Sequence, residues 1–487
     1  MTAFAASSPP DSAVSPQSPA SPASPGGPGG PGGPGGPGAP PGAAAPTNGA
    51  AQSGDGGGAA AALLACGLMG ALAFLPFVKV APNRLLSGEP VFLLALLQAL
   101  GLTGQLLAAG AALVWLTLLI AAARQSGSAF VSAASAALSA LAVPAALALA
   151  AWHAHGVALQ ASSLEGTSLG SLTPGSFTLV RTSLGSGFWL ALLLLGWLAS
   201  SAFKRPGGPA GSKSGRGWAL ACALVALAVV PTAALLASGA CADLSLLKEY
   251  AVRADVFAQA VLRHVQLVAL ALLLAVAVGL PLGWAAYQSN PAGSVGSSDR
   301  AGRVGLWLLP ALNVVQTIPS IALFGLLMAP LAWLAASVPA LSRAGISGVG
   351  LAPALVALTL YGLLPVVRGT LAGLQAVPQA VLQAANGLGL SRWQTFWQVQ
   401  VPLAAPVVLG GVRTTAIQAV GLAAVTALIG AGGLGGLVFE GLFSSAQDLV
   451  LLGVLPIVLM GWLVDAGMGA LLALVSRQPV QPGGAAA

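Results

Sequence analysis

Long apolar runs separated by short polar segments make up most of the chain after Ala59. A helix needs roughly 20 residues to cross about 30 Å of hydrocarbon, and most of these runs approach or exceed that length. The pattern predicts an all-α, polytopic membrane protein with about ten transmembrane helices. The expected spans are 59–80, 101–122, 129–151, 187–203, 217–237, 265–287, 304–335, 351–374, 404–429 and 449–475.

Composition supports a membrane protein and excludes the soluble classes. Of the 487 residues, 56% are hydrophobic and 6% are charged, whereas about 25% of a typical soluble domain is charged. So few charges cannot cover the surface of a water-soluble domain of this length. The formal net charge is +7, but the basic residues lie singly between apolar runs. We therefore expect the lipid bilayer as a partner and no nucleic acid.

The chain divides into four regions that differ in amino-acid composition. Residues 1–58 are rich in proline and glycine, which predicts a disordered leader. Polar residues and prolines lie within the later spans, where they are tolerated only if protein or a cavity covers them. The later spans are therefore expected to be the functional half. The four regions are the leader 1–58, a membrane region of about five helices at 59–263, the functional region 264–475 and the tail 476–487.

The distribution of charge predicts an orientation. If the N-terminus is cytoplasmic, most of the lysines and arginines fall on the cytoplasmic side of the alternating spans, while the opposite side is close to neutral. This asymmetry follows the positive-inside rule, so both termini are expected in the cytoplasm.

A stretch between the eighth and ninth spans is too polar to cross a membrane. Pro378 suits the first turn of a helix, Gly387 and Gly389 supply a turn, and Ser391 begins a second helix that Pro402 is expected to end. The result is a short helix–turn–helix on the cytoplasmic side.

This stretch resembles the coupling loop of bacterial binding-protein-dependent ABC permeases. That loop reads Glu-Ala-Ala, three residues, Gly, nine residues, an aliphatic, one residue, an aliphatic and Pro. A glutamine stands here in place of the usual glutamate, which removes a charge but keeps the length and hydrogen-bonding capacity. An ordinary amphipathic loop is the alternative. The matching positions are Gln383, Ala384, Ala385, Gly389, Val399, Val401 and Pro402.

A second resemblance narrows the family. The run from Asn313 to Ser320, and the run from Ile429 to Gly435, look like the corresponding segments of osmoprotectant permeases for glycine betaine and choline. Segments 81–84, 181–189 and 243–250 resemble a YehY-like branch of that family, which has an extra N-terminal membrane region.

These resemblances imply a type I ABC importer permease core in a bacterial inner membrane. They also imply a separate ATPase subunit that uses ATP, a second permease subunit that is a copy or a paralogue, and a periplasmic substrate-binding protein. The implied substrate is glycine betaine or a related quaternary-ammonium osmoprotectant, taken up as an amino-acid-like zwitterion.

Independently of the resemblance, residues 313–320 have the chemistry of a polar path. Pro319 removes a backbone hydrogen bond and frees nearby carbonyls, so an unwound, polar segment is expected within the membrane. Such a segment carries no fixed charge, which suits a zwitterion that must enter and leave. A proline kink held by neighbouring helices is the alternative. The candidate path residues are Asn313, Gln316, Thr317, Pro319 and Ser320.

The run from Gly430 to Gly435 formally matches G-x-G-x-x-G. It follows a membrane span on the outer side and has no preceding strand, so dinucleotide binding is rejected. Glycines here are expected to let an outer loop pack tightly or hinge as a gate, with a simple turn equally compatible. The candidate gate residues are Gly430, Gly432, Gly433 and Gly435.

Aromatic faces attract quaternary ammonium groups, and a few aromatics lie in or beside the C-terminal spans. They are candidates for the cation of such a substrate, while Thr317 and Ser320 are candidates for its carboxylate. Ordinary packing is the alternative. The aromatics are Phe324, Tyr361, Phe439 and Phe443.

The remaining motifs favour a transport subunit over an enzyme. No G-x-x-x-x-G-K-[ST] occurs, so ATP hydrolysis is expected on another chain and no cofactor on this one. His153 and His155 are spaced as a possible metal pair, but an exposed loop is the preferred reading, and no metal site is expected. A secondary transporter or channel for a small zwitterion is the alternative function, and it would need intramembrane ionisable pairs or an inverted repeat, which the sequence does not display. A membrane enzyme would need clustered catalytic side chains, and three histidines are too few.

Overall fold

The structure is a computed structural model and is predominantly helical. It describes residues 70–72, 74–81, 88–106, 109–110, 112–113, 129–166, 180–203, 215–289, 300–343 and 345–476. The expected leader 1–58 and most of the expected spans 59–80 and 101–122 lie outside these residues, as does the tail after Ser476.

Within the described residues, six helices are long and apolar enough to cross a membrane. Two shorter apolar helical stretches, Ser186–Gly196 and Ala223–Ala237, overlap the expected fourth and fifth spans. The predicted all-α membrane class is therefore confirmed, although the described part does not test a count of ten. The six helical stretches are Ala136–Ala161, Ala254–Gln288, Ser320–Ser337, Leu351–Gln375, Arg392–Ile429 and Gln447–Val475.

A small sheet lies among the helices of the N-terminal region. Strand β1 (Pro76–Ala81) pairs antiparallel with β2 (Glu89–Phe92) on one side and with β3 (Arg181–Leu184) on the other. The expected span 59–80 therefore ends in a strand instead of a helix. The partner β3 lies about a hundred residues further along the chain, and periodicity does not reveal pairing over such a distance.

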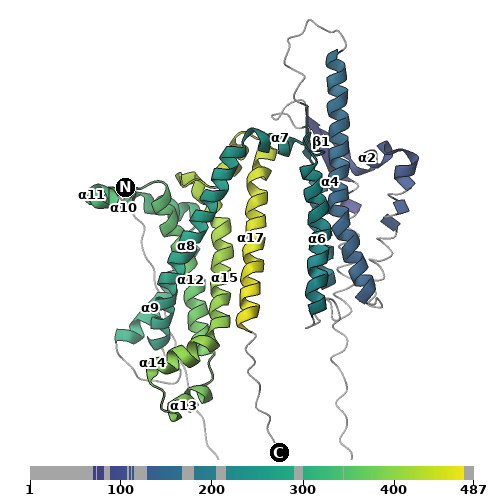
Figure 1. Ribbon diagram of the computed structural model, residues 1–487. Coiled ribbons are helices and arrows are strands. Elements are labelled where there is room, and N and C mark those ends of the chain that lie inside the picture. The colour runs from purple at the N-terminus through teal and green to yellow at the C-terminus, as the bar shows by residue number, and fades with distance from the viewer. Residues whose placement is uncertain are drawn as a thin grey trace, which may run out of the picture. The chain divides into compact units, whose positions relative to one another are not determined.

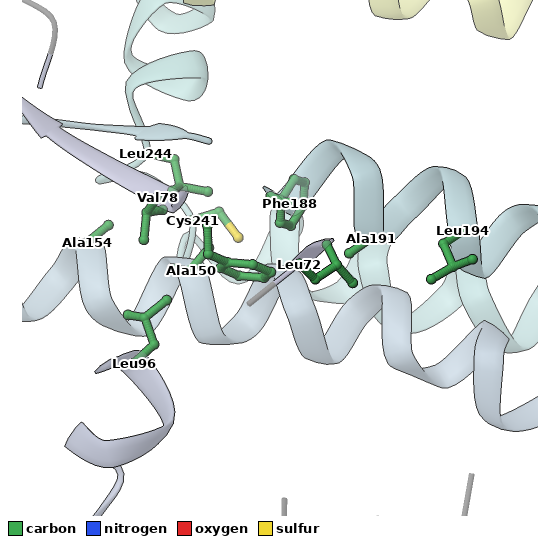
Figure 2. Close-up of a cluster of buried hydrophobic side chains, with 12 residues drawn as sticks. Leu72, Val78, Leu96, Ala150, Ala154, Phe188, Ala191, Leu194, Cys241 and Leu244 are labelled. Atoms are coloured by element: carbon green, nitrogen blue, oxygen red, sulfur yellow. The ribbon is translucent and has the colours of Figure 1, made fainter. Parts of the chain in front are cut away.

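The N-terminal region has its own apolar core. Helices α2 (Leu93–Ala99), α4 (Ala129–Gly166) and α5 (Ser186–Phe203) contribute to it together with β1. The rings of Phe77 and Phe188 meet edge to face with centroids 5.5 Å apart. Figure 2 shows Cys241 and Leu244 beside Val78, so the chain after α6 (Gly215–Ala237) returns to this core. Burial raises the pKa of the Cys241 thiol, which makes it a poor nucleophile.

The link between the N-terminal region and the later helices is a short helix. Helix α7 (Ser245–Val252) precedes α8 (Ala254–Ser289), which begins with Asp255 in its first turn. The expected boundary near Arg263 falls inside α8, because this helix starts before the apolar run that marked the expected span.

The expected single span 304–335 is wrong, because the chain breaks at Ile318 and Pro319. Helix α9 (Arg300–Thr317) ends there and α10 (Ser320–Ser337) begins. Pro319 lacks the N–H that a continuous helix would need. An interruption at this proline was expected, but not that it would divide the span into two separate helices.

Helix α12 (Leu351–Gln375) packs between α8 and α15 (Val401–Val425), and Figure 1 shows these helices side by side. Glycines allow the close approach: an added Cβ at Gly279 of α8 would lie 2.7 Å from Val366 Cγ1, and one at Gly369 would lie 3.0 Å from Gly411 Cα. Small residues are the usual means of bringing membrane helices together.

Two helices complete the C-terminal region. Helix α16 (Gly435–Phe443) follows the glycine run, and α17 (Gln447–Val475) packs against both α15 and α16. A short helix α11 (Pro339–Arg343) follows α10.

Candidate functional site

The predicted helix–turn–helix begins with α13 (Gln379–Gly387), for which Pro378 is the N-cap. The helix ends in a left-handed turn: Gly389 has φ +77°, and the N–H of Leu390 donates to the carbonyl of Ala385 at 3.2 Å. This pair of features is a Schellman ending, which satisfies carbonyls that the helix leaves open. Helix α13 and its turn lie at one end of α12 and α15 (Figure 1).

The second helix starts as expected but continues further. Ser391 caps α14 (Arg392–Gln394) in a reciprocal capping box, since its hydroxyl accepts from the N–H of Gln394 and its N–H donates to the Gln394 side chain. A π-helical turn over Thr395–Gln400 then joins α14 directly to α15.

The prediction that Pro402 ends this helix is therefore wrong. The N–H of Val401 donates to the carbonyl of Phe396, five residues back, so the turn before Pro402 is wider than an α-helical one. A wider turn accommodates the proline ring, and Pro402 then occupies the first turn of α15, where a missing N–H is tolerated.

The seven predicted coupling residues fall into two sets. Gln383, Ala384 and Gly389 are exposed on α13 and its turn, whereas Ala385 is buried and anchors the helix. The other three lie at the start of α15 or just before it, with Val399 and Val401 half-buried and Pro402 exposed. The exposed set leaves one face of α13 open to another molecule.

Sequence reasoning missed an aromatic cluster beside this segment. Trp393, Phe396 and Trp397 lie within ring contact of one another, and Phe396 also meets Trp284 of α8 with centroids 5.7 Å apart. Leu388, at the turn, is 81% exposed. The sequence signal that could have indicated this cluster was the pair of tryptophans four residues apart in a polar segment.

The helix break at Pro319 is held by side chains that were expected to line a path. The Gln316 amide donates to the carbonyl of Tyr361 at 2.8 Å. That carbonyl would normally accept from residue 365, but Pro365 has no N–H. Gln316 therefore fills a vacancy in the backbone of α12.

The contact is reciprocal, because the Tyr361 hydroxyl donates to the carbonyl of Ile318 at the break. Two further candidates also have local partners: the Thr317 hydroxyl donates to the Val314 carbonyl at 2.7 Å, and Arg368 donates to the Asn313 side chain at 2.7 Å. Thr317 and Pro319 are exposed, and Ser320 is half-buried. The five residues thus lie together around one break.

We expect Gln316→Leu to destabilise the protein by about 1–3 kcal/mol, because it leaves the Tyr361 carbonyl without its donor in the helix interior. Thr317→Val is the control, since its bond is local and exposed and its loss should matter less. Thermal unfolding in detergent measures both. Equal midpoints for Gln316→Leu and the wild type would contradict the assigned role of the amide.

The glycine run forms a tight loop after a short 3₁₀ turn, Thr426–Ile429. Gly430, Gly432 and Gly433 have φ angles of +79°, +80° and +87°, all in the left-handed region. Gly435 is required for space, since an added Cβ would lie 1.8 Å from the carbonyl oxygen of Ala424. The loop is therefore packed against α15 as well as turned.

Two consecutive residues of α8 lie against this loop, and sequence reasoning missed both. Arg263 Nε donates to the Ala431 carbonyl at 3.0 Å. His264 is fully buried; its Nε2 lies 3.1 Å from the carbonyl of Val420 and, since a carbonyl only accepts, must donate. An added Cβ at Gly433 would lie 3.3 Å from His264 Nδ1. The available signal was an ionisable residue in an apolar helix, but the expected span began one residue later.

The four aromatic candidates do not form one cage. Phe324 and Tyr361 are buried in the same apolar cluster, where they pack with Leu323. Phe439 and Phe443 stack on each other in α16, with centroids 6.3 Å apart. The buried pair is part of the core, and the α16 pair is separate from it.

An ion pair joins two of the membrane-length helices. Arg413 of α15 contacts Asp465 of α17 at 2.6 Å, and the side chains are 36% and 42% exposed. The sequence does not display this pair, because its two residues are 52 positions apart and come together only in the fold. His155 also has an acidic partner, Asp243, at 2.9 Å. Among the described residues, no group of three or more His, Cys, Asp or Glu side chains is placed to hold a metal ion.

Two family models cover most of the chain. Residues 279–478 match the binding-protein-dependent transport system inner membrane component, and residues 58–247 match the N-terminal domain of the ABC transporter permease YehY. The first match contains α9 to α17, and therefore the coupling segment, the helix break and the glycine loop.

Characterised permeases resemble the C-terminal half. The osmoprotectant import permease protein OsmW of Salmonella typhimurium is 37% identical over 207 residues, 42% of this chain and 84% of that protein. The glycine betaine/carnitine/choline transport system permease protein OpuCB of Bacillus subtilis is 32% identical over 202 residues, 42% of this chain and 80% of that protein. A structure of the MetNI methionine ABC transporter aligns with 46% of this chain and 98% of its own, at 19% identity and a TM-score of 0.40. The chain therefore belongs to the binding-protein-dependent transport permeases, the multi-pass inner-membrane subunits of ABC importers, and carries the N-terminal domain of the YehY branch.

Proposed function

We propose that this permease imports glycine betaine or a related quaternary-ammonium osmoprotectant. The observation that carries the substrate class is the 37% identity to OsmW across 84% of that permease. The helix break adds chemical support, because Thr317 and Ser320 offer hydroxyl groups there. Hydroxyl groups suit a zwitterion, since they hold neither of its charges too tightly for release.

The family implies an ATPase and a substrate-binding partner, and we propose where each one binds. The exposed face of α13, with Gln383, Ala384 and Gly389, is the docking surface for a separate ATPase, which alone uses ATP. The charge asymmetry supports a cytoplasmic location for this face and for both termini. A periplasmic binding protein delivers substrate at the opposite end, where the glycine loop acts as the outer gate. A second permease subunit, a copy or a paralogue, completes the pathway.

The substrate is tested by uptake in cells that have this transporter as their only route. Labelled glycine betaine should enter, choline is tested beside it, and an uncharged sugar should not enter. Sugar uptake without betaine uptake would overturn the substrate assignment. Gln316→Ala and Thr317→Ala test the path, with membrane levels measured so that loss of fold is separated from loss of transport. Unchanged betaine uptake in both variants would overturn the proposed path.

The assembly is tested by purification in mild detergent. An ATPase that carries a Walker A motif should co-purify with this chain, and uptake should require ATP. Transport by the isolated chain without an ATPase would overturn the proposed assembly.

A further inference from the structure

Helix α7 lies between two apolar cores. Leu244, which precedes it, is buried in the N-terminal core, and Leu247 packs against the same cluster. Leu246, its immediate neighbour, packs instead against the cluster that Leu434 and Leu437 form with residues of α17. Adjacent side chains of one short helix therefore contact the N-terminal region and the α16–α17 region.

The sheet fixes the position of α7. Thr182 of β3 forms a parallel bridge with Leu244, directly before the helix. This pairing brings Arg181 to α7, where its Nη1 donates to Glu249 Oε1 at 2.5 Å. The Glu249 side chain is only 4% exposed and that of Arg181 is 14% exposed. A buried carboxylate in this setting depends on its cationic partners.

The charges continue from α7 to α16. Arg253, at the end of α7, lies 3.7 Å from Glu249 Oε2 through its Nε atom. Its Nη1 donates to Glu440 Oε1 of α16 at 2.7 Å. Positive and negative side chains thus alternate in the order Arg181, Glu249, Arg253, Glu440. We call these four residues the ion chain.

We propose that the N-terminal region positions the outer gate through the ion chain, with Glu249 as a positioning residue for transport. The inference rests on the proposed function in one respect, the assignment of the glycine loop as the gate. Helix α16 begins at Gly435, where that loop ends. A shift of α16 therefore moves the loop, and it must either break the Arg253–Glu440 contact or carry α7 with it. Movement of α7 is opposed by its anchor in the N-terminal core.

The ion chain makes a specific demand: a change at Arg181 must be felt at α16, to which Glu249 and Arg253 connect it. Arg181 also interacts electrostatically with Asp448 of α17. Hydrogen exchange of the purified full complex measures this directly on residues 435–444. We expect Glu440→Gln to speed exchange there about two- to fivefold, the range for partly exposed ion pairs. Arg181→Gln should speed it at least as much, because it removes a cationic partner from the buried Glu249 carboxylate. Exchange in the double variant should be only slightly faster than in the faster single variant, because both changes interrupt the same ion chain.

Three matched controls separate the ion chain from a general loss of stability. Lys248→Gln changes α7 outside the chain, where Lys248 faces Asp243 at 3.7 Å, and it should leave residues 435–444 unchanged. Arg181→Lys and Glu440→Asp keep the charges and should retain most of the protection from exchange at residues 435–444. Exchange in α12 should be unaffected in every variant.

Unchanged exchange at 435–444 in Arg181→Gln would overturn the proposal, as would equal acceleration in α12 or in Lys248→Gln. Uptake is measured on the same variants, with betaine in the wild type as reference. Absence of betaine uptake by the wild type overturns the proposed substrate but leaves the exchange result standing. Normal uptake with faster exchange at 435–444 would also overturn the role in transport.

Discussion

Gly435→Ala is expected to abolish uptake while the other helices still fold. The added Cβ would lie 1.8 Å from the Ala424 carbonyl oxygen and 2.7 Å from its carbon, so no side-chain movement can relieve the overlap. The start of α16 must then move away from α15. Overpacking of this kind costs about 1–3 kcal/mol or more, and here the whole strain falls on the glycine loop.

Gly436→Ala is the matched control, because an added Cβ at this neighbouring residue meets nothing within 4 Å. Uptake of labelled betaine and the amount of protein in the membrane are measured for both variants. Gly436→Ala should transport normally. Normal transport by Gly435→Ala would show that the loop accommodates a shift of α16, and the close packing would then not be required for function.

Gly389→Val is expected to lower uptake at least about tenfold, since the left-handed conformation costs a residue with a Cβ roughly 1–2 kcal/mol and a β-branched one more. Its φ of +77° ends α13, and an added Cβ would touch nothing within 4 Å in this chain. The expected loss therefore arises from backbone conformation, which sets how α13 and Leu388 face the ATPase.

Two companion variants separate conformation from contact. Gly389→Asn should retain most uptake, because asparagine tolerates the left-handed region. Gly387→Val places the same side chain two residues earlier, where an added Cβ also meets nothing within 4 Å and φ is not positive. Equal losses in Gly389→Asn and Gly389→Val would point to direct contact between the glycine and the ATPase. ATPase stimulation in the purified complex measures coupling, and membrane levels report insertion.

Features that depend on neighbouring residues were predictable from the sequence. The cap at Ser391, the turn at Gly389 and the break at Pro319 all follow from local backbone chemistry, and the structure has each of them. Apart from 304–335, the helical spans after residue 129 were also predictable, because their apolar runs are long.

Features that depend on distant partners were not predictable. The pairing of β1 with β3 joins separate parts of the chain, and Arg253 and Glu440 are 187 residues apart. His264 was missed because its burial arises from α15 and the glycine loop, not from its own helix. The prediction that the helix ends at Pro402 failed because the π-helical turn that accommodates this proline has no simple sequence signature.

The glycine contacts among α8, α12 and α15 also bear on how the permease moves. Gly369 and Gly411 bring the backbones of α12 and α15 together, and Gly279 of α8 receives the side chain of Val366 of α12. We therefore expect these three helices to move as one unit. Alternating access then needs hinges elsewhere. The fold offers two, at Ile318–Pro319 between α9 and α10 and at the glycine loop before α16. Opening and closing would then be carried by movements of α9, α10 and α16 around these three helices.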